Sequence, residues 1–146
     1  VRVDAGALME EIVGQLLSVG LPAGANVKVE KHFESVLLDA DDAAPLTLLV
    51  SEAMTNALKY VPAHGKDTPG SISISLTFEE PDHARLTISN TVGEKPEEAG
   101  TGLGSRLIQA FSRQLNGQTE VRDDEDSYHM TVVFPVPQRS KQVYDY

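Results

Sequence analysis

Residues 48–60 read Leu48-Leu49-Val50-Ser51-Glu52-Ala53-Met54-Thr55-Asn56-Ala57-Leu58-Lys59-Tyr60. The apolar residues in and around this stretch recur at the spacing of one face of an α-helix, and they are Leu46, Leu49, Val50, Ala53, Ala57 and Val61. A helix turns by about 100° per residue, so Glu52, Asn56 and Lys59 return to nearly one azimuth. The sequence therefore predicts a buried helix that carries an acid, an amide and a base along one stripe.

This polar stripe has two interpretations. A carboxylate that positions a proton or water, an amide oxygen that binds a hard cation and a lysine that faces phosphate would together suit Mg-nucleotide chemistry. The alternative is a solvated helix face with an ordinary i,i+4 polar pattern. The stripe taken alone favours the solvated face, so the assignment depends on the rest of the chain.

Composition limits the class of protein. The chain has 146 residues, 40% of them hydrophobic, which is enough for one domain with a core. Its formal net charge of −10 disfavours nonspecific binding to nucleic acid or to an anionic membrane surface. It has no cysteine, no apolar run of membrane-spanning length and no signal-like N-terminus. We expect a cytoplasmic domain without direct membrane contact, cut from a longer parent that is itself either soluble or membrane-anchored.

The first half of the chain predicts two helices around short strands. Asp4 is expected to cap a helix that runs to about Val19, and residues 27–33 alternate as a strand. Residues 36–38 form a second, short strand. Asp41 and Asp42 are expected to precede the second helix, with Pro45 in its first turn.

The second half predicts two hairpins separated by a loop and a helix. Residues 71–78 and 85–89 pair across a turn at 81–83, and residues 118–122 pair with 129–134. Residues 91–104 form a loop, and residues 105–115 form a helix. The fold class is α+β: a two-layer sandwich with a mixed, mainly antiparallel sheet and about three helices on one face. We expect residues 1–137 to form the domain and residues 138–146 a loosely ordered tail.

Two further features accompany the stripe. Gly100-Thr101-Gly102-Leu103-Gly104 precedes a helix, where backbone N–H groups can approach a phosphate closely. Arg106 lies one turn into that helix and can reach the same anion, although a glycine-rich hinge and a surface arginine are the ordinary readings. Asn90 ends a strand on the same face as Ile88 and offers both a donor and an acceptor, as adenine does, although it also suits a turn.

With these three features in order, the chain resembles the ATP-binding domain of sensor histidine kinases in the GHKL, or Bergerat, ATPase superfamily. Residues 52–60 resemble the N box, residues 100–104 the second glycine box and Phe134-Pro135-Val136 the closing strand. The Asn-Ala-Leu-Lys-Tyr ending of residues 56–60 is most similar to HWE-like kinases. The resemblance covers nearly the whole chain and implies a Bergerat fold with ATP and Mg²⁺ held between helices and a lid.

The resemblance also implies roles for individual residues. Asn56 would bind Mg²⁺, Glu52 would act as base or position water, and Lys59 would face phosphate oxygens, which makes these three the catalytic set. The nucleotide-binding set would be Asn56, Lys59, Tyr60, Asn90, Gly93, Thr101, Gly102, Leu103, Gly104 and Arg106. The γ-phosphoryl group would pass to a histidine on an upstream dimerisation domain, and a response regulator would be the further partner. This chain alone would bind nucleotide without autophosphorylating.

The adenine box departs from the family pattern. Residues 90–94 read Asn90-Thr91-Val92-Gly93-Glu94 where an Asp-x-Gly-x-Gly box is usual. Asparagine can accept from N6 and donate to N1 of adenine, but a flipped amide would suit guanine. We therefore expect weaker or less base-selective binding, with Asn90→Asp tolerated or favourable.

Two alternatives stay open. An anti-sigma-factor serine kinase shares the N box and the second glycine box. A degenerate, non-hydrolysing adaptor that engages a response regulator would explain the altered adenine box. Against the adaptor, Glu52, Asn56 and Lys59 are all retained together.

Overall fold

The computed structural model describes residues 1–21, 23–61, 69–92 and 103–138 of the chain. Its elements in chain order are β1 (Arg2–Asp4), α1 (Ala5–Gly20), β2 (Val27–Phe33), β3 (Leu37–Asp39), α2 (Ala40–Tyr60), β4 (Gly70–Glu79), β5 (His83–Thr91), α3 (Leu103–Gln114), β6 (Gln118–Asp123) and β7 (Ser127–Pro135).

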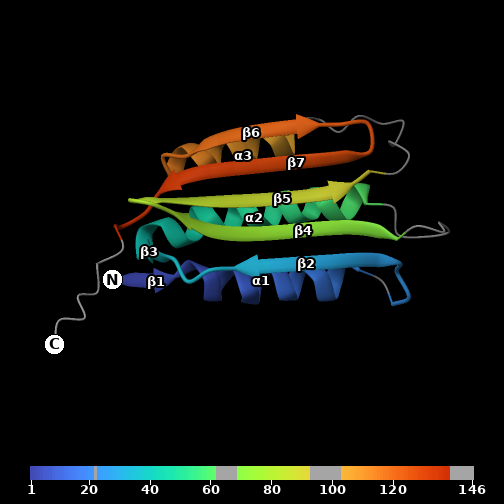
Figure 1. Ribbon diagram of the computed structural model, residues 1–146, viewed down its shortest axis with the longest axis horizontal. Coiled ribbons are helices and arrows are strands. Elements are labelled where there is room, and N and C mark those ends of the chain that lie inside the picture. Colours follow the sequence, from blue (N-terminus) through green and yellow to red (C-terminus); the bar gives the residue numbers. More distant parts are fainter. Residues whose placement is uncertain (22, 62–68, 93–102, 139–146) are drawn as a thin grey trace.

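The strands form a five-stranded sheet and a small two-stranded sheet. The large sheet has the order β2-β4-β5-β7-β6, in which β2 and β4 are parallel and every other neighbouring pair is antiparallel. The small sheet pairs β1 with β3. All three helices cover one face of the large sheet, and α2 lies between α1 and α3 (Figure 1). The predicted α+β sandwich with a mixed sheet and one helical face is confirmed.

The core lies between the helices and the inward side chains of β4, β5 and β7. Alternate residues of these strands are buried, as the period of two in the sequence predicts. They are Ile72, Ile74 and Leu76, then Ala84, Leu86 and Ile88, then Met130, Val132 and Phe134. The predicted apolar face of α2 is buried against them, including Leu46, Leu49, Val50, Ala53 and Ala57. Each large aliphatic side chain buried in this way favours folding by roughly 1.5–3 kcal/mol.

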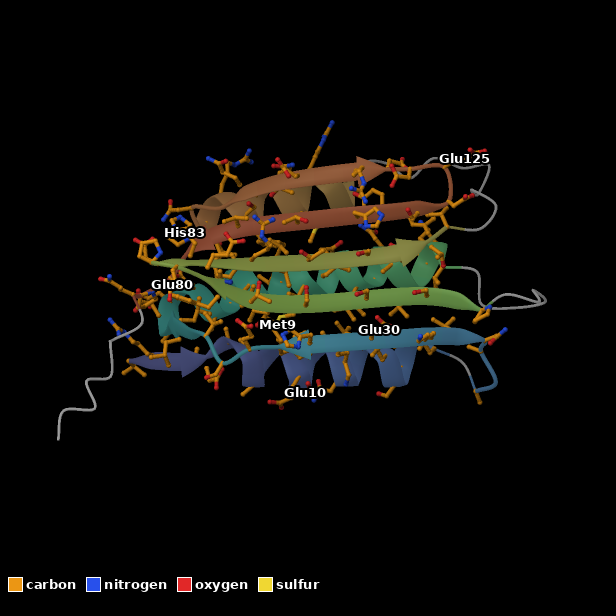
Figure 2. The ribbon with its side chains drawn as sticks, in the orientation of Figure 1. Met9, Glu10, Glu30, Glu80, His83 and Glu125 are labelled. Atoms are coloured by element: carbon orange, nitrogen blue, oxygen red, sulfur yellow. The ribbon has the colours of Figure 1, made fainter. Side chains whose placement is uncertain are left out.

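The opposite face of the sheet carries polar side chains. Ser73 and Ser89 form a cross-strand pair there, and so do Thr87 and Thr131. Figure 2 labels Glu30 on β2, which is an edge strand of this sheet. This face is only partly exposed because the side chains of neighbouring strands shield one another. The sheet is therefore amphipathic, with one side against the helices and the other open.

The start of α2 differs from the prediction. The helix begins at Ala40, so Asp41 and Asp42 lie inside its first turn and the buried Pro45 lies in its second turn. The reason is a strand that the sequence did not reveal: β1 pairs with β3 up to Asp39, and the Ala40 N–H donates to the Val1 carbonyl at 3.0 Å. The chain enters the helix directly from this short sheet.

Other boundaries differ from the prediction as well, and β4, β5 and β7 begin one or two residues earlier, at Gly70, His83 and Ser127. β5 continues through Thr91, whose hydroxyl accepts from the Ser71 N–H at 2.9 Å and so extends the β4–β5 pairing. α3 begins at Leu103 rather than at Ser105. Apart from Gln138, which is exposed, the predicted tail lies outside the described residues.

Candidate functional site

Two helices and two strands surround a small cavity on the helical side of the sheet. α2 contributes Ala53 and Asn56, and β5 contributes Ile88 and Asn90. The other lining residues are Ile108 of α3 and Tyr128 and Met130 of β7. Asn56 and Asn90 were predicted from different motifs, and the fold brings both amides to the same cavity.

The three residues of the predicted stripe on α2 differ in their solvent exposure. Asn56 is half-buried and lines the cavity three residues after Ala53, as helical spacing requires. Glu52 is half-buried one turn before Asn56. Lys59 is exposed near the end of the helix, and its Nζ lies 5.4 Å from the centre of the Tyr60 ring. The ammonium group can therefore extend beyond the cavity while it keeps a cation–π contact with the Tyr60 ring.

Asn90 is the deepest polar residue of the cavity. Its exposed fraction is 5%, on the same face of β5 as Ile88, as the sequence predicts. Its Nδ2 donates to the carbonyl oxygen of Thr91 at 3.0 Å. β4 and β7 flank it, with Ile72 and Tyr128 as its cross-strand partners. The amide is thus held by the strand that carries it.

Tyr128 lies beside Asn90 on the neighbouring strand β7 and also lines the cavity. Burial raises the pKa of its phenol above the usual 10.0, and the nearby Asp123 and Tyr60 raise it further. The phenol remains neutral through the physiological pH range and can serve as a donor or acceptor.

The glycine-rich half of the predicted site is only partly described. Gly93, Thr101 and Gly102 lie outside the described residues. The backbone of Leu103 and Gly104 forms the first turn of α3, and Arg106 is exposed in that turn. Ile108 of the same helix reaches the cavity. α3 thus borders the cavity through Ile108.

Sequence reasoning predicted Ala53 and Ile88 only as inward apolar residues and did not predict Ile108, Tyr128 and Met130 as part of the site. The predicted strand, residues 129–134, includes Met130, Val132 and Phe134, but β7 begins at Ser127 and so also contains Tyr128. Their position beside Asn90 depends on the register between β5 and β7, which sets Asn90 against Tyr128 and Ile88 against Met130. A sequence pattern gives no such pairing register by itself.

The cavity is narrow in this conformation. The volume open to the centre of a water molecule is about 10 Å³, which is roughly the space for one water. Ligand pockets for small molecules usually measure about 300–1,000 Å³. A purine base would therefore require the surrounding side chains to move apart. Asn56 and Tyr128 are the half-buried members of this wall.

A larger hollow of about 530 Å³ lies elsewhere, lined by Thr87, Glu120, Val121, Arg122, His129 and Thr131. Thr87, His129 and Thr131 alternate with the buried residues of β5 and β7, so this hollow opens on the polar face of the sheet. It contains none of the predicted site residues. We therefore assign the site to the smaller cavity, where the chemistry of the side chains converges.

The acidic surroundings affect how a polyanion could bind. Asp123 ends β6, and the β6–β7 loop carries Asp124, Glu125 and Asp126. All four are exposed, and Figure 2 shows Glu125 at the tip of the loop. The carbonyl oxygen of Asp126 accepts from the Val92 N–H at 2.9 Å, which ties this loop to the end of β5. Phosphate groups near this loop would need a cation or Lys59 to offset the repulsion.

The described residues contain no cluster of three or more histidine, aspartate and glutamate side chains that could hold a metal. Mg²⁺ commonly keeps several water ligands and binds through one or two protein oxygens together with substrate phosphates. The Asn56 amide oxygen at the cavity fits that limited role, and Glu52 lies one turn away on the same stripe. The residues present therefore suit a Mg²⁺ that arrives with a phosphate ligand.

Residues 41–140 match the family described as histidine kinase-, DNA gyrase B- and HSP90-like ATPase. The chain belongs to this family. The match covers α2, the cavity and the strands through β7. Membership in this ATPase family implies nucleotide binding. It also explains why the predicted N-box helix, the adenine-box strand and the third helix meet at one cavity.

Solved structures support the family fold. The histidine kinase domain of the Erythrobacter litoralis EL346 blue-light activated histidine kinase has a TM-score of 0.77 at 21% identity and is matched over 92% of this chain and 62% of its own. The mycobacterial sensor histidine kinase MprB has a TM-score of 0.74 at 16% identity, over 94% of this chain and 99% of its own. Full-length ShkA, solved in complex with AMPPNP, has a TM-score of 0.72 at 17% identity, over 94% and 31%.

The family member described here corresponds to part of its larger structural relatives. It spans 62% of the Erythrobacter kinase domain and 43% of the Erythrobacter blue-light activated histidine kinase chain. None of the curated proteins matches the chain. Among the helices that the structure describes, none has both the length and the apolar character that a membrane crossing requires.

Proposed function

We propose that this family member is the ATP-binding catalytic domain of a two-component sensor histidine kinase, most similar to the HWE-like branch. The observation that carries the proposal is the convergence of Asn56 from the N-box helix and Asn90 from the adenine-box strand on one cavity. ATP would place its base toward Asn90. Its phosphates would lie toward Asn56, Lys59 and the start of α3.

In this proposal the protein mainly positions and neutralises charge. Asn56 binds Mg²⁺ through its amide oxygen, and Lys59 faces the phosphates from the exposed end of α2. Glu52 acts as base or positions water. Tyr60, Gly93, Thr101, Gly102, Leu103, Gly104 and Arg106 complete the nucleotide-binding set. Phosphoryl transfer depends largely on such positioning and on offsetting charge in the transition state.

The acceptor in this proposal is a histidine on a dimerisation domain upstream of this chain, and a response regulator then receives the phosphoryl group. The domain works in the cytoplasm and contacts neither nucleic acid nor membrane directly. The present chain binds nucleotide but does not phosphorylate itself. Incubation with γ-labelled ATP should leave it unlabelled, and stoichiometric labelling would contradict this assignment of the acceptor.

The experiment that tests nucleotide binding is thermal unfolding with Mg-ADP. A ligand that binds only the folded state raises stability by RT ln(1 + [L]/Kd), so the melting temperature should rise with ADP concentration. Titration followed by NMR should shift the signals of Asn56, Asn90 and Tyr128 first. The matched control is adenosine with Mg²⁺, which retains the base but lacks the phosphates.

The non-hydrolysing adaptor remains the second candidate, because the cavity has room for about one water molecule and asparagine replaces the usual aspartate. The two functions differ in one result. A kinase domain should respond to millimolar Mg-ADP, whereas an adaptor should show no shift in melting temperature and should still bind a response regulator.

A further inference from the structure

The strand β6 forms one edge of the large sheet (Figure 1). β7 pairs with one side of it, and among the described residues no strand pairs with the other side. All residues of β6 are exposed except Thr119, which is half-buried. An open edge of this kind offers backbone hydrogen-bonding groups to a further strand, so natural proteins usually protect it with charges or a covering segment.

The hairpin turn shows which residues of β6 direct their backbone groups toward the open side. The Asp124 N–H donates to the Ser127 carbonyl oxygen at 2.8 Å, so these residues form a hydrogen-bonded pair of the β6–β7 ladder. Hydrogen-bonded pairs alternate along an antiparallel ladder, so the even-numbered residues of β6 exchange their hydrogen bonds with β7. The backbone N–H and C=O groups of Thr119 and Val121 therefore point away from β7.

The side chains in the middle of β6 are complementary to one another. Glu120 and Arg122 project on the polar face of the sheet, because they lie opposite polar-face residues of β7. Val121 projects on the helical face, yet its exposed fraction is 51%. Within the described part of the chain, Glu120 has no ion-pair partner. Arg122 reaches Asp124 Oδ2 through Nε at 3.1 Å, which leaves its terminal nitrogens for another carboxylate.

We propose that β6 pairs antiparallel with β6 of a second copy of this chain, about a two-fold axis through Val121. The outward-pointing residues must meet one another, which limits the axis to Glu120, Val121 or Arg122 near the middle of the strand. An axis through Glu120 or Arg122 would set like charges directly opposite each other, which is unfavourable. The axis through Val121 instead places Glu120 opposite Arg122 of the second copy at two symmetric positions, with the two valines facing each other.

The other edge strand of the sheet lacks this combination. On β2, Lys31 projects on the helical face, and its Nζ lies 3.0 Å from Glu10 Oε1 of α1. An inward-pointing charge protects an edge strand against pairing. Lys28 and Glu30 of β2 already form an ion pair with each other at 3.2 Å. The apolar Val121 has no such protection, so β6 is the edge that favours self-pairing.

The pairing would join two sheets into one continuous sheet. Both strands lie in the plane of that sheet, so the two-fold axis would be perpendicular to it and the helices of both copies would face the same side. Short strands bury little area and each chain carries a net charge of −10, so we expect a weak dimer with a Kd between high micromolar and millimolar. A dimerisation domain that tethered two copies would supply an effective concentration in that range. The contact itself does not depend on nucleotide binding.

Sedimentation velocity tests the contact through charge reversal. The unmodified chain should show a reversible monomer–dimer equilibrium between micromolar and millimolar concentration. Glu120→Arg and Arg122→Glu should each weaken self-association at least about tenfold, because two favourable cross-strand pairs become two unfavourable ones. An equimolar mixture of these variants should dimerise again, since opposite charges then face each other, and this also shows that both variants are folded.

The control variant is Glu11→Arg, which makes the same change in net charge at an exposed position of α1. It should leave dimerisation unchanged or strengthen it by reducing general repulsion. A chain that stays monomeric up to millimolar concentration would overturn the proposal, as would self-association that neither reversal weakens or a mixture that does not associate.

NMR on a mixture of labelled and unlabelled chains reads the register directly. Residues opposite each other in a non-hydrogen-bonded antiparallel pair have Cα atoms about 4.5 Å apart. An isotope-filtered contact between Glu120 Hα and Arg122 Hα of different copies is therefore expected. Contacts between copies through any other strand would overturn the proposed pairing. These outcomes are separate from Mg-ADP binding, whose failure would contradict the proposed function and leave the contact between copies in place.

Discussion

Asn90 of β5 lies directly opposite Tyr128 of β7, and both side chains line the cavity between the sheet and the helices. The pairing connects the adenine-box strand to a residue that no motif identified. Because Asn56 of α2 lines the same cavity, the cavity joins the stripe of α2 to the centre of the sheet. Changes on either element should therefore affect nucleotide binding.

Asn56→Ala should abolish detectable Mg-nucleotide binding. It removes the amide oxygen proposed to bind Mg²⁺ from the wall of the cavity, so any residual affinity should become insensitive to removal of Mg²⁺ by a chelator. Calorimetry with and without Mg²⁺ measures both effects. Thr55→Ala is the matched control, because Thr55 is the preceding residue of α2 but is exposed and donates to the Ser51 carbonyl. Normal Mg-dependent binding by Asn56→Ala would show that the stripe is only a helix face.

Lys59→Ala should weaken ATP binding by about tenfold, which is the typical effect of losing a hydrogen bond to a charged group. The loss should shrink from ATP to ADP to AMP, because Lys59 is exposed beyond the cavity and should face phosphates rather than the base. Added salt should also reduce the difference between the variant and the unmodified protein. An equal loss for all three nucleotides would place Lys59 against the base or indicate a structural effect.

Gly6→Ala should destabilise the fold by at least about 1–3 kcal/mol, as overpacking does. A Cβ at Gly6 would lie 2.2 Å from the backbone oxygen of Glu34, so α1 or the β2–β3 connection would have to shift. Urea unfolding measures the change in the free energy of unfolding.

The same helix offers a matched control for Gly6. A Cβ at Gly14 would meet no atom within 4 Å, so Gly14→Ala should stabilise α1 by about 0.5–1 kcal/mol through helix propensity alone. Opposite signs for the two substitutions are the expected outcome. Similar losses at both positions would contradict the close contact between α1 and Glu34.

In the Tyr128→Phe variant, the free energy of unfolding should fall less steeply at alkaline pH than in the unmodified protein. Burial raises the pKa of Tyr128 above 10.0 in the folded state, so between the unfolded and folded pKa values the folded protein binds more protons than the unfolded chain. The contribution is fully present below pH 10 and is lost as pH rises through the folded pKa. Urea unfolding from neutral pH to above pH 10 should show a smaller decline for the variant. Parallel declines would show that the phenol ionises equally in both states.

Local patterns in the sequence predicted most of the elements. The alternation of residues 71–78 and the helical spacing from Leu46 to Val61 correspond to β4 and α2, because each buries one face at its own period. Asp4 was also predicted as a cap, and its Oδ1 accepts from the Gly6 N–H at 2.9 Å. β1 was missed because three residues that pair with a distant strand carry no usable periodicity. The start of α2 was misplaced for the same reason.

The same division between local sequence patterns and long-range contacts holds for the site. The sequence by itself determined which side chains are available: the stripe of Glu52, Asn56 and Lys59, and an asparagine at the end of an inward-facing strand. Only the tertiary structure decided that Asn56, Asn90 and Tyr128 share a cavity, because the register of β5 against β7 and the packing of α2 on the sheet are long-range relationships. It also decided the orientation of the Asn90 amide, since that depends on where the Thr91 carbonyl points within the folded strand.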